Sequence, residues 1–298
     1  MPDLVNVWMV AGVLLHLAGQ LARGRAWHTV VRAAHGADVT VRRRDVLRAW
    51  VAGAGVTGIV SARGGDVVRV LMLRRRVEAT TCATLAGTLA AEAVAEAACG
   101  TLVVGWAAGA GLMPAAGGSG LLAALGAVAA MVAIAWACTR RWERLRRVRD
   151  EAWQGLTALR RPSFYVRRVL PWELLGRTVR LGSLTCFLIA FGLPVSPAAV
   201  ALVMAAQAGG RLVPFGPAGT GVSLAILAVT FGTVTGEAVS VEQLAAFVVG
   251  TSAILTVVGL ALSAALVLQA MPVSALRRAL AARHADAAPV TPVAPLTP

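Results

Sequence analysis

Several long apolar blocks constrain this sequence more than any other feature. Each is long enough to cross a bilayer, since a transmembrane helix needs about 17–25 residues. Within lipid, every backbone N–H and C=O must be paired inside the segment, so such blocks must be helical. The chain is 58% hydrophobic, with a mean hydropathy of +0.74. We therefore expect an all-α polytopic membrane protein, a helical bundle. The blocks cover residues 4–21, 79–108, 121–138, 170–193 and 244–268.

The charges predict how these blocks are oriented. The formal net charge is +14, and every basic residue apart from four histidines is arginine. The arginines cluster beside apolar blocks, which is typical of cytoplasmic loops facing anionic lipid and not of nucleic-acid binding. Residues 23–28, 36–48 and 140–168 are accordingly expected inside the cell. This orientation predicts a plasma-membrane protein with an extracytoplasmic N-terminus and a cytoplasmic C-terminus.

Two apolar segments are too short to span. Residues 50–62 are basic on both flanks and lead into Ser-Ala-Arg-Gly-Gly-Asp-Val-Val-Arg at 61–69, where Gly64 and Gly65 permit a turn or a close approach. A segment whose two ends both prefer the cytoplasm is expected to enter the membrane, break and return. Such re-entrant backbone is tolerated only where protein or a wet cavity covers it.

The second broken segment consists of two short apolar stretches, residues 198–208 and 222–235, separated by a Gly- and Pro-rich break at 209–221. No arginine lies near its flanks, so it is expected to enter from outside. Short interrupted helices in corresponding places of two halves are typical of an inverted-repeat transporter. Eight separate crossings are the competing topology. The predicted turn residues of this second break are Pro214, Pro217, Gly219 and Gly221.

The same patterns predict one transmembrane unit, residues 1–284. Its first half is residues 1–139, and its second half is residues 170–284. Between them, residues 140–169 form a basic cytoplasmic segment, predicted to lie on the membrane surface as an amphipathic helix. Residues 285–298 are rich in Ala, Pro and Thr and predict a disordered tail.

Glu92 and Glu96 are the most informative charged residues, because they lie four apart on one helical face inside an apolar block. A charge at the centre of a membrane helix costs about 2.5–3.5 kcal/mol, so it is retained where a partner or a cavity compensates. The two carboxylates are therefore expected to face a transport path. The alternative is a structural pairing with Arg63, Arg69 or Arg211.

The charges at the two breaks predict a phosphate site. Arg63, Asp66 and Arg69 lie at the first break, and Arg211 is the only basic residue between Arg180 and Arg277. A guanidinium group matches two oxygens of a phosphate, as in a phospholipid or polyprenyl-phosphate headgroup. The alternative is that Arg63 and Arg69 anchor the chain at the membrane surface, with Asp66 capping the next helix.

No motif predicts an enzyme, a metal or a cofactor. The four cysteines have unrelated spacings, which supports neither a zinc site nor a disulfide framework. Nucleophile-elbow, zinc-protease, Walker and Rossmann patterns are absent from the sequence. We expect no catalytic residue, no metal and no cofactor, and a transporter rather than an enzyme.

Four motifs follow one another along the chain; they begin at Arg25 (Arg-Ala-Trp), Ser61, Glu92 (Glu-Ala-Val-Ala-Glu) and Pro214 (Pro-Phe-Gly-Pro-Ala-Gly-Thr-Gly). Taken in order, they resemble the lysylphosphatidylglycerol synthase transmembrane-region family, the flippase-like domain of multiple peptide resistance factor and YbhN-type proteins. The resemblance implies two re-entrant elements and movement of lipid across the bilayer. The family commonly has a Glu where Leu224 stands, so a role tied to that residue is not expected here. The resemblance also implies that the soluble aminoacyl-transfer domain of bifunctional members is not expected here, and neither is lipid aminoacylation.

Together these features predict a flippase for a phosphate-bearing lipid, either a phospholipid or a polyprenyl-phosphate-linked lipid. The expected partners are the lipid substrate, anionic inner-leaflet lipids, and either a second copy of the chain or a cell-envelope enzyme. Two alternatives remain open: a membrane-embedded transferase acting on a lipid-linked substrate, and a non-transporting partner of a cell-envelope enzyme.

Overall fold

A computed structural model describes residues 2–36, 39–57, 62–77, 80–109, 143–210 and 219–270. Within these ranges the chain is helical and contains no strand. The predicted all-α class is therefore confirmed. The predicted crossing over residues 121–138 and the predicted tail lie outside the described residues.

Four long helices form the frame. At 1.5 Å per residue, the shortest of them is about 31 Å long, which matches the ~30 Å hydrocarbon core of a bilayer. Two stretches, Val5–His35 and Val241–Leu266, are long and apolar enough to cross a membrane. Helix α1 exposes large apolar side chains at Val7, Leu14 and Leu21, seven residues apart on one face, as expected where a helix faces lipid. The long helices are α1 (Pro2–His35), α4 (Cys82–Gly109), α9 (Leu170–Ala190) and α12 (Val241–Ala270).

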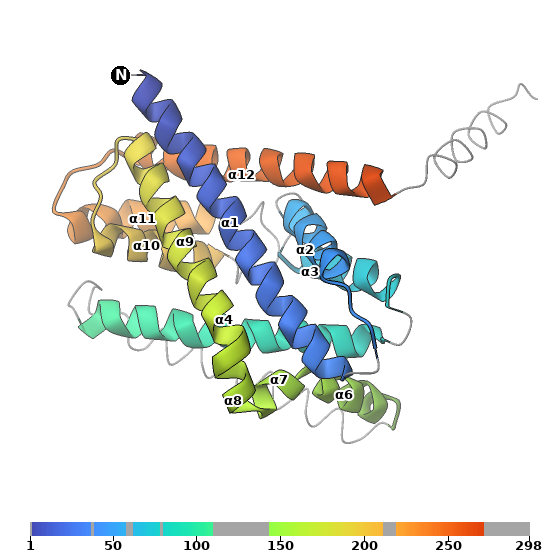
Figure 1. The fold of residues 1–298 in the computed structure, drawn as a ribbon. Coiled ribbons are helices and arrows are strands. Elements are labelled where there is room, and N and C mark those ends of the chain that lie inside the picture. The colour runs from blue at the N-terminus through green and yellow to red at the C-terminus, as the bar shows by residue number, and fades with distance from the viewer. Residues whose placement is uncertain are drawn as a thin grey trace, which may run out of the picture.

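Helices α1 and α9 run side by side in opposite directions (Figure 1). Small residues let their backbones approach closely. A Cβ on Gly19 would lie 3.3 Å from the Gly176 carbonyl oxygen, and one on Gly12 would meet the Phe187 ring at 2.9 Å. The Ser183 hydroxyl donates across the same contact to the Gly12 carbonyl, 2.7 Å away. Small residues and interhelical hydrogen bonds are the usual means of holding membrane helices together.

Four shorter helices pack in two pairs, α2 on α3 and α10 on α11. Their 13 to 16 residues give lengths of about 20–24 Å, less than the hydrocarbon core. In Figure 1, α4 and α12 lie nearly parallel across the view, with the α2–α3 pair toward one end and the α10–α11 pair toward the other. The short helices are α2 (Arg43–Thr57), α3 (Ala62–Arg74), α10 (Pro197–Gly210) and α11 (Thr220–Thr235).

The structure corrects the predicted turn at Gly64 and Gly65. Both glycines are helical, in the first turn of α3, and α2 ends earlier, at Thr57. A Cβ on Gly65 would overlap the Thr57 hydroxyl and lie 2.5 Å from the Gly53 carbonyl oxygen. Gly65 therefore serves close packing of α3 on α2, which only a residue without a side chain allows.

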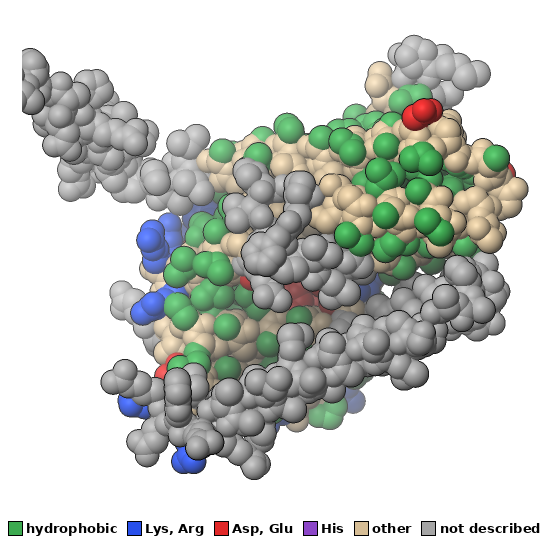
Figure 2. Space-filling view, turned by 180° about the vertical axis from the view of Figure 1, so that it is seen from behind, with side chains coloured by type: hydrophobic (Ala, Val, Ile, Leu, Met, Phe, Trp, Pro, Cys, Tyr) green, Lys and Arg blue, Asp and Glu red, His purple; other side chains and the backbone are tan. Residues whose placement is uncertain are grey.

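The basic segment that follows the undescribed residues 110–142 forms short helices against α4 and α1. Gly87 of α4 and Ala152 of α6 meet so closely that a Cβ on Gly87 would overlap the Ala152 carbonyl oxygen. Seen from behind, arginines gather toward one end of the molecule and hydrophobic side chains cover much of the other (Figure 2). The segment comprises α6 (Glu143–Gly155), α7 (Thr157–Arg160), α8 (Pro162–Phe164) and the π-helical turn η1 (Tyr165–Val169).

Helix α2 also packs on α12 through small residues, and this contact yields a stability prediction. A Cβ on Gly55 would overlap the Ser263 hydroxyl and lie 2.5 Å from the Gly259 carbonyl oxygen. Gly55→Ala is expected to destabilise the protein by about 1–3 kcal/mol, because overpacking forces backbones apart. Thermal unfolding in detergent measures this.

Gly182→Ala in α9 is the matched control, since its Cβ would meet only Leu15 at an ordinary 3.5 Å. Equal melting temperatures for the Gly55 and Gly182 variants would contradict the proposed close contact between α2 and α12.

Candidate functional site

A ladder of polar contacts joins α1 to α4. Arg23 Nη2 lies 2.6 Å from Glu92 Oε1 and 3.2 Å from Glu96 Oε2. One turn further along α1, Trp27 Nε1 donates to the Thr88 hydroxyl at 3.0 Å. The three α4 residues are four apart, and so are the two α1 residues, so helical spacing places each set on one face. The regular spacing of polar residues on α1 and α4 thus joins the two helices, which run antiparallel, through successive polar contacts.

The two carboxylates of this ladder differ in environment. The Glu92 side chain is 5% exposed, whereas the Glu96 side chain is 40% exposed. A buried carboxylate is retained only if it is paired and hydrogen-bonded. Arg23 provides both the charge and the hydrogen bond to Glu92, and its stem packs over Gly176, where a Cβ would lie 3.0 Å from Arg23 Cγ. Glu92 is therefore fixed by its pairing with Arg23, whereas the Glu96 carboxylate is accessible from outside the helix contact.

The fully buried Trp50 ring holds a second arginine beside the ladder. The Arg69 Cζ atom lies 3.8 Å from the ring centroid, and that of Arg23 lies 5.5 Å away. Both distances fall within the range of a cation–π interaction. Trp50 Nε1 donates to Gln20 Oε1 at 3.1 Å, which fixes the ring. One indole thus positions two guanidinium groups, and Arg69 also pairs with Asp66 at 3.0 Å.

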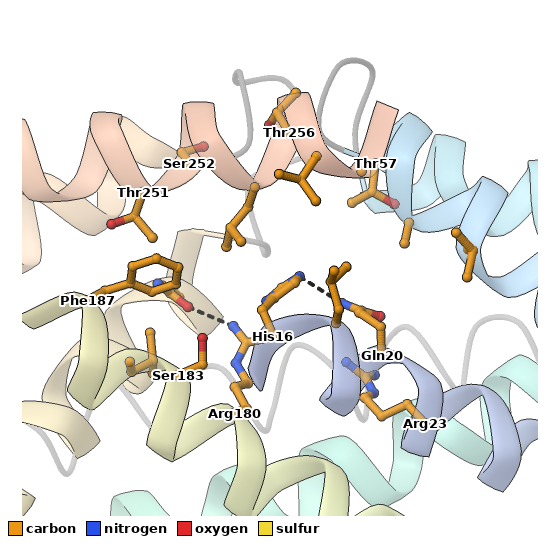
Figure 3. Close-up of a pocket in the computed structure, with 18 of the residues that line it drawn as sticks. His16, Gln20, Arg23, Thr57, Arg180, Ser183, Phe187, Thr251, Ser252 and Thr256 are labelled. Carbon is orange, nitrogen blue, oxygen red and sulfur yellow. Dashed lines mark hydrogen bonds between the residues drawn. The ribbon is translucent and has the colours of Figure 1, made fainter. Parts of the chain in front are cut away.

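These charged groups border a cavity of about 680 Å³. Helices α1, α2, α9 and α12 surround it, as the close-up in Figure 3 shows, and α3, α4, α10 and α11 also contribute to its lining. Leucines, valines and Phe187 and Phe247 form the apolar part of its wall. The polar lining includes His16, Gln20, Arg23, Arg48, Asp66, Arg69, Glu96, Arg180, Gln207 and Thr251.

The structure brings only part of the predicted site together. Asp66, Arg69 and Glu96 line the cavity, and Glu92 lies behind them, paired with Arg23. Arg211, Pro214, Pro217 and the side chain of Arg63 lie outside the described residues. Gly219 precedes α11 with φ +64°, a left-handed conformation that favours glycine, whereas Gly221 is already within α11.

Arg23 is a site residue that the sequence analysis misses. The sequence assigns it, with Trp27, to a cytoplasmic border, and the alternative considered for Glu92 and Glu96 is a pairing with Arg63, Arg69 or Arg211. Instead α1 continues to His35, Trp27 is buried, and Arg23 is the ion-pair partner of both carboxylates. A signal was present, because His16, Gln20, Arg23 and Trp27 recur at intervals of four, three and four residues on one helical face.

Among the described residues, no cluster of three His, Cys, Asp or Glu side chains is arranged to hold a metal ion. Cys82 and Cys186 are free thiols. The arrangement offers guanidinium groups with neighbouring carboxylates, which suits binding of an ionic group.

The fold and site define a helical membrane protein with an internal, partly charged cavity. The lysylphosphatidylglycerol synthase TM region family matches residues 3–263 of the chain, and the chain belongs to that family. No curated protein and no solved structure matches it. Family membership makes this a membrane protein with a lipid-related role in the cell envelope.

Removal of Arg23 tests whether it compensates the buried carboxylate. Arg23→Gln is expected to destabilise the protein by about 3–5 kcal/mol, because it leaves Glu92 charged and unpaired. Adding Glu92→Gln to that variant is expected to restore part of the loss, and thermal unfolding of the two single variants and the double variant gives the coupling.

Arg149→Gln is the control, since the Arg149–Asp150 pair is more exposed and is expected to contribute about 1 kcal/mol or less. Additive effects of the Arg23 and Glu92 substitutions would contradict the pairing.

Proposed function

We propose that the protein translocates a phosphate-bearing lipid, a phospholipid or a polyprenyl-phosphate-linked lipid, between the two leaflets of the membrane. The observation that carries this proposal is the cavity, which has a charged wall formed by Arg23, Asp66, Arg69 and Glu96 and is lined elsewhere mainly by apolar side chains. The chain also belongs to a family of lipid-related membrane proteins. An amphiphile needs both kinds of surface, one for its headgroup and one for the start of its chains.

The headgroup would bind at the charged wall. Arg69 lies at the cavity surface, and a guanidinium can bind two phosphate oxygens at once. Its partner Asp66 is 48% exposed, so a phosphate can replace the carboxylate without leaving a buried charge unpaired. Glu96 is similarly accessible beside Arg23. Exchange between internal carboxylates and a headgroup keeps the arginines paired at each step.

The size of the cavity fits part of a lipid. Its 680 Å³ lies within the roughly 300–1,000 Å³ of ordinary small-ligand pockets. Such a volume suits a headgroup and the adjoining part of its chains, with the remainder of the chains in the bilayer. The polar part of the lipid would thereby avoid the hydrocarbon during the crossing.

The topology we propose places the two short helix pairs as re-entrant elements of an inverted repeat. Residues bordering both breaks line the same cavity: Thr57 and Asp66 at the first, Gly219 and Thr220 at the second. The α2–α3 pair would enter from the cytoplasm, because its outer ends carry exposed arginines, and the α10–α11 pair from outside. Residues 1–284 would form one transmembrane unit with an extracytoplasmic N-terminus and a cytoplasmic C-terminus.

A leaflet-resolved assay tests the proposal. Purified protein in liposomes should move a fluorescent phospholipid between leaflets, measured by the fraction of label that a membrane-impermeant quencher can reach over time. Arg69→Gln and Glu96→Gln are each expected to slow transfer by about tenfold or more, because a charge-assisted hydrogen bond contributes about 1.5–3 kcal/mol.

Arg76→Gln is the matched control, since Arg76 is exposed in the turn that follows α3 and does not line the cavity. Transfer no faster than in protein-free liposomes, for phospholipid and for a polyprenyl phosphate alike, would refute the proposed transport. Chemical turnover of a radiolabelled lipid precursor without transfer would favour the membrane-embedded transferase instead.

A further inference from the structure

Glu173 of α9 is a buried carboxyl group that the site described above does not use. It is 3% exposed, and its Oε2 atom is enclosed without a hydrogen-bond partner among the described residues. The helical run from residue 162 to 190 is continuous, so Glu173 lies inside it and gains nothing from a free helix N-terminus. A buried carboxylate keeps its charge only where it is paired and hydrogen-bonded, and otherwise binds a proton.

The charged groups that act on Glu173 come from three helices. Arg23 of α1 and Arg177 of α9 attract its carboxylate, whereas Glu92 and Glu96 of α4 repel it. Arg23 is already bonded to both of those carboxylates, at 2.6 and 3.2 Å. Its charge is therefore committed, and Glu173 would add a third carboxylate beside it.

The other arginines of α1 and α9 near this point have partners elsewhere. Arg25 lies over the ring of Trp172, 5.1 Å from its centroid, and Arg180 donates to Gln207 of α10. Among the described residues, only Arg177 comes within ion-pair distance of Glu173.

Arg177 has two possible partners. Its Nη2 atom lies 4.0 Å from Glu173 Oε2, beyond hydrogen-bond reach, and donates instead to the Ala95 carbonyl of α4 at 3.3 Å. Its Nε atom is enclosed and has no partner among the described residues. Residues four apart face each other on a helix, so rotation of the Arg177 side chain can bring the guanidinium onto Glu173. An ionised Glu173 would draw Arg177 away from α4, and a protonated one leaves it there.

We propose that Glu173 is a proton-binding site that couples lipid transfer to the movement of a proton. With the proton bound, Arg177 joins α9 to α4, as observed. When the proton leaves to water, Arg177 pairs with Glu173 and releases α4, whose Glu96 lines the cavity. Intramembrane carboxyl groups form the proton relays of pumps and transporters. The coupling to lipid rests on the proposed function, whereas the proton site rests on the geometry of α9.

Infrared spectroscopy of the full-length protein in detergent tests the proton site. A protonated carboxyl group has a C=O stretching band that a carboxylate lacks. This band is expected at neutral pH and should be lost in Glu173→Gln, whose neutral amide should leave the melting temperature nearly unchanged. Glu173→Asp should retain a protonated carboxyl band. Glu242→Gln is the matched control, since Glu242 is exposed at the start of α12, and this variant should keep the band.

A proton gradient across liposomes tests the coupling. If one proton moves with each lipid, a gradient of about one pH unit is expected to shift the leaflet distribution of a fluorescent phospholipid by up to about tenfold. A protonophore should abolish the shift. Glu173→Gln should lose it, and Glu242→Gln should keep it.

The two experiments fail separately. An infrared band that persists in folded Glu173→Gln, or that is missing at neutral pH from the original protein and from Glu173→Asp, would overturn the proton site. Lipid transfer that ignores the gradient would overturn the coupling and leave the proposed function standing. If the band depends on Glu173 in a protein that transfers no lipid under any gradient, the proposed function fails and the proton site stands.

Discussion

The ion pair between Arg23 and Glu92 is the interaction on which the rest of the structure depends. Inside a membrane, neither charge is tolerated without the other, and their 2.6 Å contact fixes α1 against α4 at one point along both helices. Arg23 also packs over Gly176, so the same side chain sets the approach of α9. Three long helices are therefore positioned by one arginine, which also lines the cavity.

Trp50 of α2 connects the α2–α3 pair to α1. Its ring lies beside both Arg23 and Arg69, and its N–H is bonded to Gln20 of α1. On the two sides of α2, glycines at 53 and 55 admit α3 and α12 at backbone contact, where any side chain would overlap. The helices that carry the charged wall of the cavity are thus closely packed, as the proposed binding of a headgroup to a preorganised site requires.

The helical class and most element positions could be predicted from the sequence, because apolar length and arginine placement obey the strong constraint of the bilayer. Glu92 and Glu96 were recognisable for the same reason, as charges that must be compensated. The compensating residue was not, since Arg23 resembles a border arginine until α1 is seen to continue past it. The role of Gly65 was also hidden, because a glycine permits either a turn or a close contact and only the neighbouring helix decides between them.

The unequal exposure of Glu92 and Glu96 suits Arg23 both to stabilising the fold and to the proposed binding of an ionic group. Glu92 is buried and remains paired, so it can hold Arg23 in place whatever occupies the cavity. Glu96 binds the same guanidinium from the cavity side, and its carboxylate is the one that a ligand can reach. Because Arg23 keeps its pairing with Glu92, its charge stays compensated when a ligand replaces Glu96. That property is what a site must have if ionic groups are to enter and leave it within the membrane.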